Sequence, residues 1–252
     1  MFGEGRMKIA LPVMGTEEQT LLQEVEECLK QKPDVIEWRI DHFLKKNCVL
    51  KDGKFWLRDI PAEFFETARK VLVLCTDCPL LVTFRTGYEG GEAFLSEEQY
   101  VELLTRIAKD RLADLIDVER YFLKSPGEGA KLCEWIRKQG IRVICSNHDF
   151  QKTPKRQEIV LRLSEMERMG ADIAKIAVMP NSREDVLTLL SASLEADQKL
   201  SIPVITMSMG EYGVISRLAG NVSGSCLTFA CAGKASAPGQ LPVHVVKEVL
   251  GD

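Results

Sequence analysis

Short apolar runs rich in β-branched residues recur along the whole chain, and a segment with helical periodicity follows each of them. The runs predict eight strands, at residues 8–14, 35–41, 80–86, 115–120, 142–148, 173–179, 204–209 and 225–231. The accompanying helices are predicted at residues 16–32, 62–75, 96–111, 129–139, 155–169, 183–198, 213–218 and 242–250. The strands start roughly every 30 residues, the length of a strand, a crossover helix and two short loops. Eight such α/β units in 252 residues predict a closed parallel (β/α)8 TIM barrel, with residues 1–252 forming a single domain.

A doubly wound open sheet is the competing architecture for a chain that alternates strands and helices. At this length it would usually show fewer strands, and it often carries a glycine-rich phosphate turn after the first. Neither G-x-G-x-x-G nor G-x-x-x-x-G-K-[ST] occurs here, which favours the barrel. The gap between the second and third strands is longer than the others and contains Asp52-Gly53, a pair typical of tight hairpins. A small β-hairpin insertion is therefore predicted at residues 47–56.

Charge and composition argue against several classes of partner. The net charge is -4 with lysines and acids interspersed, so neither nucleic acid nor a membrane surface is expected as a partner. No apolar stretch reaches about 18 residues, and the N-terminus lacks the apolar core of a signal peptide, so a cytoplasmic protein is expected. Most of the eight cysteines lie among apolar neighbours, where cysteine acts as a small hydrophobe. Cys75 and Cys78 form the only close pair, with no second pair or histidine nearby, so no metal site is predicted.

Lys175 stands in the middle of the apolar run at residues 173–179. Burying an unpaired ammonium is costly, so such a lysine must pair with an acid or lose its proton. A neutral lysine amine attacks carbonyls and forms imines. The residue by itself leaves two interpretations open: Schiff-base chemistry, or a structural lysine with Asp172 as the obvious partner.

Polar side chains gather at the predicted C-terminal ends of the strands, where the catalytic groups of a parallel barrel lie. Glu37, Arg39 and Asp41 alternate along the second strand and are expected to project inward from one face. The fourth strand likewise ends with two acids on one face, Asp117 and Glu119. The second-strand triplet could equally be a structural ion-pair network inside the barrel.

Other strand ends carry groups suited to catalysis. The third strand runs into a glycine-rich loop with Glu89, and the fifth ends at His148. The segment at residues 233–240 is small and flexible enough to form a lid over a ligand. Taken singly, His148 reads as a structural histidine and Met207 as a core residue. Because all these positions fall at one end of one predicted barrel, they favour a binding site together.

Six motifs, in order along nearly the whole chain, resemble type I 3-dehydroquinate dehydratase (3-dehydroquinase). They are Glu37-Trp38-Arg39-Ile40-Asp41-His42-Phe43, Thr83-Phe84-Arg85-Thr86 with Glu89-Gly90-Gly91-Glu92, Asn147-His148-Asp149-Phe150, Lys175-Ile176-Ala177, Met207-Ser208-Met209-Gly210 with Ser216-Arg217, and Ala235-Ser236-Ala237-Pro238-Gly239-Gln240. The resemblance implies a (β/α)8 barrel lyase (EC 4.2.1.10) that converts 3-dehydroquinate to 3-dehydroshikimate by syn elimination of water. This hydro-lyase reaction is the third step of the shikimate pathway for aromatic amino acid biosynthesis. It further implies a homodimer with no cofactor and no metal.

The same resemblance implies a role for each site residue. Lys175 forms a Schiff base with the substrate ketone, His148 is the general base and acid, and Glu89 is the carboxylate that orients His148. Arg217 binds the substrate carboxylate, and Met207 packs against the ring. The hydroxyls are held by Glu37, Arg39, Arg85, Ser236 and Gln240.

One departure from the family pattern lies at the end of the first strand. Pro12 stands where some relatives place a serine that reaches the substrate, so a hydrogen bond worth on the order of 1 kcal/mol is expected to be missing. Two other functions remain open: a class I aldolase that also uses Lys175, and a barrel that binds a sugar acid without turning it over. Retention of both Lys175 and His148 argues against the second.

Overall fold

The computed structural model describes residues 2–3, 5–233 and 235–251 of the protein, and the contacts within it define two compact units. The first unit is Pro12–Val143. The second unit joins the chain up to Leu11 to the chain from Ile144 onward. The predicted single domain stays a prediction.

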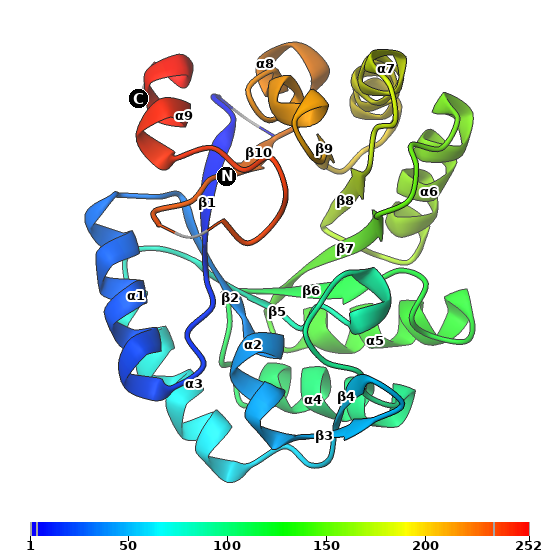
Figure 1. Ribbon diagram of the computed structural model, residues 1–252. Coiled ribbons are helices and arrows are strands. Elements are labelled where there is room, and N and C mark those ends of the chain that lie inside the picture. Colours follow the sequence, from blue (N-terminus) through cyan, green and yellow to red (C-terminus); the bar gives the residue numbers. More distant parts are fainter. Residues whose placement is uncertain (1, 4, 234, 252) are drawn as a thin grey trace. The chain divides into compact units, whose positions relative to one another are not determined.

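The second unit contains five parallel strands within its described residues, and Figure 1 shows their order. They are β1 (Lys8–Val13), β7 (Arg142–Asp149), β8 (Ile173–Val178), β9 (Val204–Ser208) and β10 (Leu227–Phe229). Strand β8 pairs with β7 on one side and with β9 on the other, and β10 pairs with β1. The N–H of Cys226 donates to the carbonyl of Val204 at 2.8 Å and links β10 to β9. The strands therefore run in the order β7, β8, β9, β10, β1.

Helices follow the strands of the second unit, as the sequence predicts. They are α6 (Arg156–Arg168), α7 (Arg183–Lys199), α8 (Gly220–Ser223), α9 (Val243–Leu250) and the 3-10 helix η3 (Tyr212–Arg217). The helix predicted at residues 213–218 is present as the 3-10 helix η3. The Ser216 hydroxyl donates to the carbonyl of Gly213 at 2.6 Å and accepts the N–H of Ser208 at 2.8 Å, which holds the segment tightly against β9.

The first unit contains three parallel strands and an antiparallel hairpin within its described residues. The parallel strands are β2 (Val35–Arg39), β5 (Leu80–Thr83) and β6 (Leu115–Glu119), and the hairpin strands are β3 (Cys48–Lys51) and β4 (Lys54–Leu57). Asp52 and Gly53 both have positive φ, 51° and 72°, as the two central residues of a type I′ turn require. The predicted hairpin insertion is confirmed.

The first unit has more helices than the sequence predicts. They are α1 (Glu18–Lys30), α2 (Ile40–Leu44), α3 (Ala62–Leu74), α4 (Glu97–Lys109), α5 (Pro126–Lys138) and the 3-10 helices η1 (Lys45–Asn47) and η2 (Gly87–Glu89). Helix α5 begins three residues before the predicted start at residue 129. Ser125 caps it by accepting the N–H of Glu128 at 3.3 Å, and Pro126 stands at the first position, where its missing N–H is not needed.

The second predicted strand ends earlier than expected, which moves a candidate residue. Strand β2 stops at Arg39, and the chain turns at once into α2, which contains Asp41. The expectation that Asp41 projects from the strand beside Glu37 and Arg39 is therefore wrong. Its carboxylate instead folds back and chelates the guanidinium of Arg39.

The cysteines have the apolar surroundings that the sequence indicates. All eight cysteines are free thiols, and seven of them are buried. Over the described part of the chain, no group of histidine, cysteine and acidic side chains is placed to hold a metal ion. None of the described helices is both long enough and apolar enough to cross a bilayer.

Candidate active site

Lys175 lies on β8 of the second unit with only 3% of its surface exposed. In the parallel register it stands between Ser146 on β7 and Ile205 on β9. Its Nζ atom lies 4.4 Å from the ring centroid of Phe229 on β10. The side chain is thus buried, as the sequence predicts, and an aromatic face lies next to the reactive nitrogen.

His148 and Met207 lie on the same face of the sheet as Lys175. His148, Ala177 and Met207 are register neighbours across β7, β8 and β9, two residues beyond the row that contains Lys175. Because side chains alternate along a strand, positions two residues apart point the same way. The Cα atoms of Lys175 and His148 are therefore roughly 8 Å apart, by standard strand spacings. The structure brings together the lysine and histidine that the sequence nominates.

Arg217, at the end of η3, is a buried cation that has no carboxylate partner within the described residues. Its Nη2 donates to the carbonyl of Pro238 at 3.0 Å, and its Nη1 lies 3.7 Å from the sulfur of Met207. Its Nε has no hydrogen-bond partner among the described residues. Burial lowers the pKa of Arg217 to about 10, so the side chain still carries its charge at neutral pH.

The predicted lid segment packs against this arginine. The amide of Gln240 donates to the Ser236 hydroxyl at 2.8 Å and accepts the N–H of Ser236 at 2.7 Å. Gly239 has a φ of +77°, and a Cβ atom there would lie 2.4 Å from the carbonyl oxygen of Gly210. Only glycine allows this close approach. The sequence prediction of the segment includes Lys234, which lies outside the described residues.

Arg39 and Asp41 form a two-pronged ion pair in the first unit. Both Nε and Nη2 of Arg39 donate to the Asp41 carboxylate at 2.9 Å. The carboxylate also accepts the backbone N–H groups of Arg85 and Glu92 at 3.3 and 3.1 Å. Although full burial acts in the opposite direction, Arg39 lowers the pKa of Asp41.

Arg85 follows β5 and is held by three carboxylates. It donates to Glu119 at 2.8 Å and to Asp117 at 2.9 Å, and its Nη1 lies 3.6 Å from Glu89. Burial works against the charge, but Asp117 and Glu119 more than offset it and raise the pKa of Arg85 well above its usual range. Burial raises the pKa of Glu119.

Glu119 also fixes the start of the loop that carries Glu89. It accepts the backbone N–H and the hydroxyl of Thr86, at 2.8 and 2.7 Å. The carbonyl of Thr86 then accepts the N–H groups of Glu89 and Gly91. Glu89 sits in η2 with 7% of its surface exposed. The glycine-rich segment is therefore an ordered turn that buries Glu89 and aims it at Arg85.

The sequence assigns no role to Asp117 and Glu119. Their alternation at the end of the fourth strand is the signal that could find them, because the register of β6 on β5 places that face beside Arg85. Glu37 lies on β2 and accepts the hydroxyl of Thr83 at 2.9 Å. Glu37 and Arg39 share one face of β2, as predicted.

In chemical terms, the second unit supplies a buried amine, an imidazole and a guanidinium that has no carboxylate partner in the described part of the chain. The first unit supplies fixed carboxylates and guanidinium groups. The sequence matches the family described as Type I 3-dehydroquinase over residues 9–251. The chain belongs to this family.

Curated relatives in the 3-dehydroquinase family match over almost their full length. The 3-dehydroquinate dehydratase of Listeria welshimeri is 44% identical over 250 residues, which cover 99% of this chain and 93% of the relative. The 3-dehydroquinate dehydratase of Clostridium kluyveri is 45% identical over 249 residues, covering 98% and 92%. The predicted family and its hydro-lyase activity, EC 4.2.1.10, are confirmed at this level.

Solved 3-dehydroquinases share the fold. The type I enzyme of Clostridium difficile, solved with covalently modified comenic acid, superposes with a TM-score of 0.89 at 40% identity and covers 99% of this chain and 93% of that one. The Geobacillus kaustophilus enzyme gives 0.89 at 36% identity, covering 99% and 92%. The fold class is thus the α/β barrel of eight parallel strands with a small hairpin after the second, as predicted.

Proposed function

We propose that this chain dehydrates 3-dehydroquinate to 3-dehydroshikimate through an imine on Lys175, in the shikimate pathway. The observation that carries the proposal is the placement of Lys175. This buried lysine lies on the same face as His148 of the neighbouring strand, with the two positions offset by two residues along the strands. Full-length similarity to enzymes named for this reaction supports the substrate. That a relative was solved with covalently modified comenic acid supports covalent chemistry in the family.

Lys175 makes the reaction possible by converting a ketone into a stronger electron sink. Its neutral amine attacks C3 of the substrate, and the carbonyl oxygen leaves as water when the imine forms. The protonated imine nitrogen then withdraws electrons from the C2–H bond. Removal of that proton gives an enamine, which expels the C1 hydroxyl as water. Hydrolysis of the imine returns the lysine, so the net change is the loss of one water.

His148 handles the proton transfers. It takes the proton from C2 and gives a proton to the departing C1 hydroxyl, which fits a syn elimination managed by one group. An imidazole suits both steps, because its ordinary pKa near 6.5 allows either form at neutral pH. Its half-buried position at the end of β7 leaves room for a ligand. Glu89 is proposed as the carboxylate that selects the tautomer of His148.

Arg217 is proposed to bind the carboxylate of the substrate. A buried guanidinium without an acid of its own is unfavourable until an anion arrives, and a carboxylate fits its planar fork. The contact with Pro238 aims the guanidinium from the lid side. Met207, whose sulfur lies 3.7 Å from Nη1 of Arg217, is proposed to pack on the substrate ring.

The remaining predicted residues are proposed to hold the hydroxyls of the same substrate molecule. Glu37 and Arg39 lie on one face of β2, and the Asp41 carboxylate holds the Arg39 guanidinium in place. Ser236 and Gln240 are hydrogen-bonded to each other, so their polar groups lie close enough together to bind the same ligand. Arg85 is proposed to act with them, although its three carboxylates make it the most constrained of the set. We further propose a cytoplasmic homodimer, as the resemblance to the family implies.

The proposal is tested by adding 3-dehydroquinate and following the ultraviolet absorbance of the conjugated enone product. Wild type is expected to produce the signal and Lys175→Met to abolish it. A wild type without signal would favour a sugar-acid binding protein. Release of a carbon fragment in place of water would favour an aldolase.

His148→Ala separates imine formation from proton transfer. We expect turnover to fall by roughly 10²–10⁴-fold, because a general acid–base catalyst is lost. The imine should still be trapped slowly by borohydride, since Lys175 remains. Unchanged turnover would refute the role of His148 as base.

A further inference from the structure

Arg217 is the last residue of η3, a 3-10 helix of six residues. Runs of 3-10 helix are usually only three or four residues long, because their hydrogen-bond geometry is poorer than that of an α-helix. At the start of η3, the backbone hydrogen bond from the N–H of Val214 to the carbonyl of Glu211 is long, at 3.5 Å. A helix of this kind depends on contacts with the rest of the fold to keep its place.

The hydroxyl of Ser216 supplies such a contact with β9. Ser216 is buried, and its Oγ accepts the N–H of Ser208 at 2.8 Å. The same hydroxyl donates to the carbonyl of Gly213 at 2.6 Å, with the carbonyl of Ser208 at 3.4 Å as a second acceptor. Apart from the weak contact of Arg217 with the sulfur of Met207, these are the side-chain hydrogen bonds that join η3 to β9 in the described part of the chain.

The backbones of η3 and β9 also approach each other closely at Gly213. A Cβ atom there would lie 2.2 Å from the carbonyl oxygen of Ser208, so only glycine allows this approach. Ser216 follows three residues later, which is one turn of a 3-10 helix. Close backbone packing and the Ser216 hydroxyl therefore fix η3 to β9 at two successive turns.

The position of the Arg217 charge depends on this attachment. Within the described residues, no carboxylate holds the guanidinium, which contacts the carbonyl of Pro238 at 3.0 Å and the sulfur of Met207 at 3.7 Å. Two-pronged recognition of a carboxylate needs the guanidinium to be placed within about 0.5 Å. We propose that Ser216 is a positioning residue that holds Arg217 in place for the substrate carboxylate. The inference rests on the proposed role of Arg217 in binding 3-dehydroquinate.

A second buried serine on the same strand offers a matched control. The Oγ of Ser225 accepts the N–H of Thr206 on β9 at 3.0 Å, and its acceptors are the carbonyls of Leu227 at 3.3 Å and Thr206 at 3.4 Å. Within the described residues, Ser225 makes no hydrogen bond to η3. Loss of either serine hydroxyl leaves one buried N–H of β9 without a partner, so the two losses should destabilise the fold similarly.

The first test compares steady-state kinetics and urea unfolding of Ser216→Ala with those of Ser225→Ala. Both variants should lower the urea midpoint by similar amounts. The KM for 3-dehydroquinate should rise in Ser216→Ala alone, by roughly 5–30-fold, the range for coupled neighbouring residues. Its kcat should change by less than about twofold, because the carboxylate is bound in the ground state and in the transition state alike. If Ser216→Ala does not fold, Ser216→Cys takes its place with a smaller rise in KM, because a thiol is a weaker hydrogen-bond partner of similar size.

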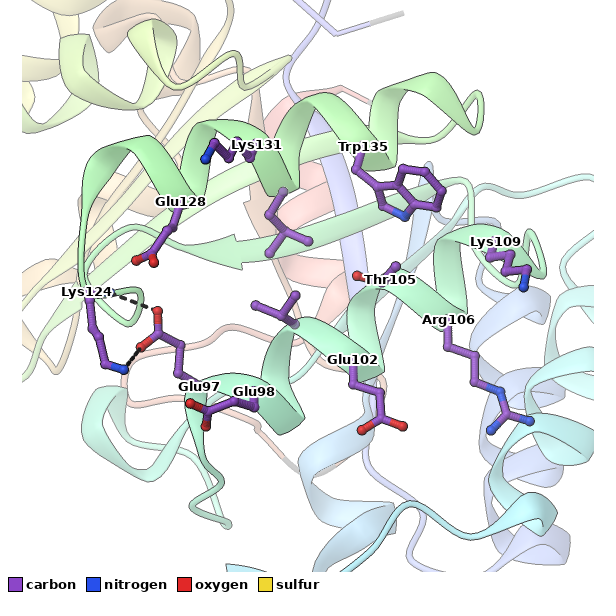
Figure 2. A pocket seen from close by; sticks show the side chains of 12 residues that line it. Glu97, Glu98, Glu102, Thr105, Arg106, Lys109, Lys124, Glu128, Lys131 and Trp135 are labelled. Atoms are coloured by element: carbon purple, nitrogen blue, oxygen red, sulfur yellow. Dashed lines mark hydrogen bonds and ion pairs between the residues drawn. The ribbon is translucent and has the colours of Figure 1, made fainter.

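Two further variants separate loss of the hydrogen bonds from truncation of a side chain. Ser208→Ala removes a hydroxyl beside η3 that has no hydrogen-bond partner among the described residues. Thr105→Ala removes a hydroxyl from the groove that α4 and α5 border in the first unit (Figure 2). Both variants should keep the KM of wild type. A KM raised as much by Ser208→Ala as by Ser216→Ala would overturn the proposal.

A double-mutant cycle tests whether Ser216 acts through Arg217. Once Arg217→Met has removed the guanidinium, addition of Ser216→Ala should raise KM by less than about twofold, because the two changes remove the same interaction. If the two effects on KM multiply instead, Ser216 influences binding by another route and the proposal is wrong.

Binding without turnover keeps this inference separate from the proposed reaction. In a Lys175→Met background, which cannot form the imine, calorimetry measures the Kd of 3-dehydroquinate. Ser216→Ala should raise this Kd by the same factor as KM, and Ser225→Ala should leave it unchanged. An inactive wild type that still shows this difference would overturn the reaction and support the role of Ser216. Equal Kd values for the two folded serine variants would overturn the role of Ser216 and leave the reaction intact.

Discussion

Two buried arginines of this protein have opposite electrostatic surroundings. Arg85 in the first unit is held by Asp117, Glu119 and Glu89 at distances of 2.8 to 3.6 Å. Arg217 in the second unit has a carbonyl and a sulfur as neighbours but no carboxylate, and its Nε lacks a partner among the described residues. Burial lowers the pKa of Arg217, whereas acids raise that of Arg85.

The difference distinguishes an arginine that stabilises the fold from an arginine that can bind a ligand. An arginine saturated by acids is fixed in place and stabilises the fold, because removing it would leave buried carboxylates unpaired. An arginine without an acid weakens the empty protein but gains most when an anionic ligand arrives. The contrast favours Arg85 as chiefly a positioning group and supports the proposal that Arg217 binds the substrate carboxylate.

The largest effect is expected for Arg85→Met. It leaves Asp117 and Glu119 buried without a cation, so the free energy of unfolding should fall by about 3–5 kcal/mol. Urea unfolding measures this. Arg69→Met is the matched control, because this half-exposed arginine pairs with Glu66 on the surface and its loss should cost less than about 1 kcal/mol. A folded Arg85→Met variant as stable as wild type would show that the network does not hold the fold.

Arg217→Met should show the reverse pattern. The KM for 3-dehydroquinate should rise roughly 30–150-fold, the equivalent of about 2–3 kcal/mol from a charge-assisted contact. The free energy of unfolding should stay the same or increase, because an unpaired buried charge is removed. Steady-state kinetics and urea unfolding on the same preparation measure both. Strong destabilisation with an unchanged KM would reverse the roles of the two arginines.

Gly239→Ala is expected to have a smaller effect, by disturbing the contact between the lid segment and Arg217. The added Cβ would collide with the carbonyl oxygen of Gly210, so Pro238 must shift away from the guanidinium. Loss of one hydrogen bond of about 1 kcal/mol should raise KM roughly fivefold. At Gly233 an added Cβ meets open space, so Gly233→Ala should behave like wild type. Equal kinetics for both variants would show that the lid does not position Arg217.

The sequence predicts the fold class because the regular alternation of strands and helices can be recognised without knowing any tertiary contact. It misplaces Asp41, because a strand that turns directly into a helix depends on the chelation of Arg39 and on backbone N–H groups distant in sequence. It also misses the start of α5, although Ser125 and Pro126 are local signals that could have placed it.

For the candidate site, the sequence nominates Lys175, His148 and Arg217. The structure places Lys175 and His148 on one face of neighbouring strands and buries Lys175 and Arg217, and the roles of the three residues stay predictions. Residue type alone does not reveal the different surroundings of Arg85 and Arg217. Their difference depends on which side chains neighbouring strands bring close. The pairing of β5 with β6 is needed to show that Asp117 and Glu119 accept hydrogen bonds from the Arg85 guanidinium.

The central claim is that Lys175 forms an imine with the substrate ketone. It is tested most directly by mixing the protein with 3-dehydroquinate, reducing with borohydride, and locating the added mass by peptide mass spectrometry. The adduct is predicted on Lys175 in wild type and in Arg85→Lys, and to be absent from Lys175→Met. An adduct on another lysine, or none in an active wild-type preparation, would contradict the account.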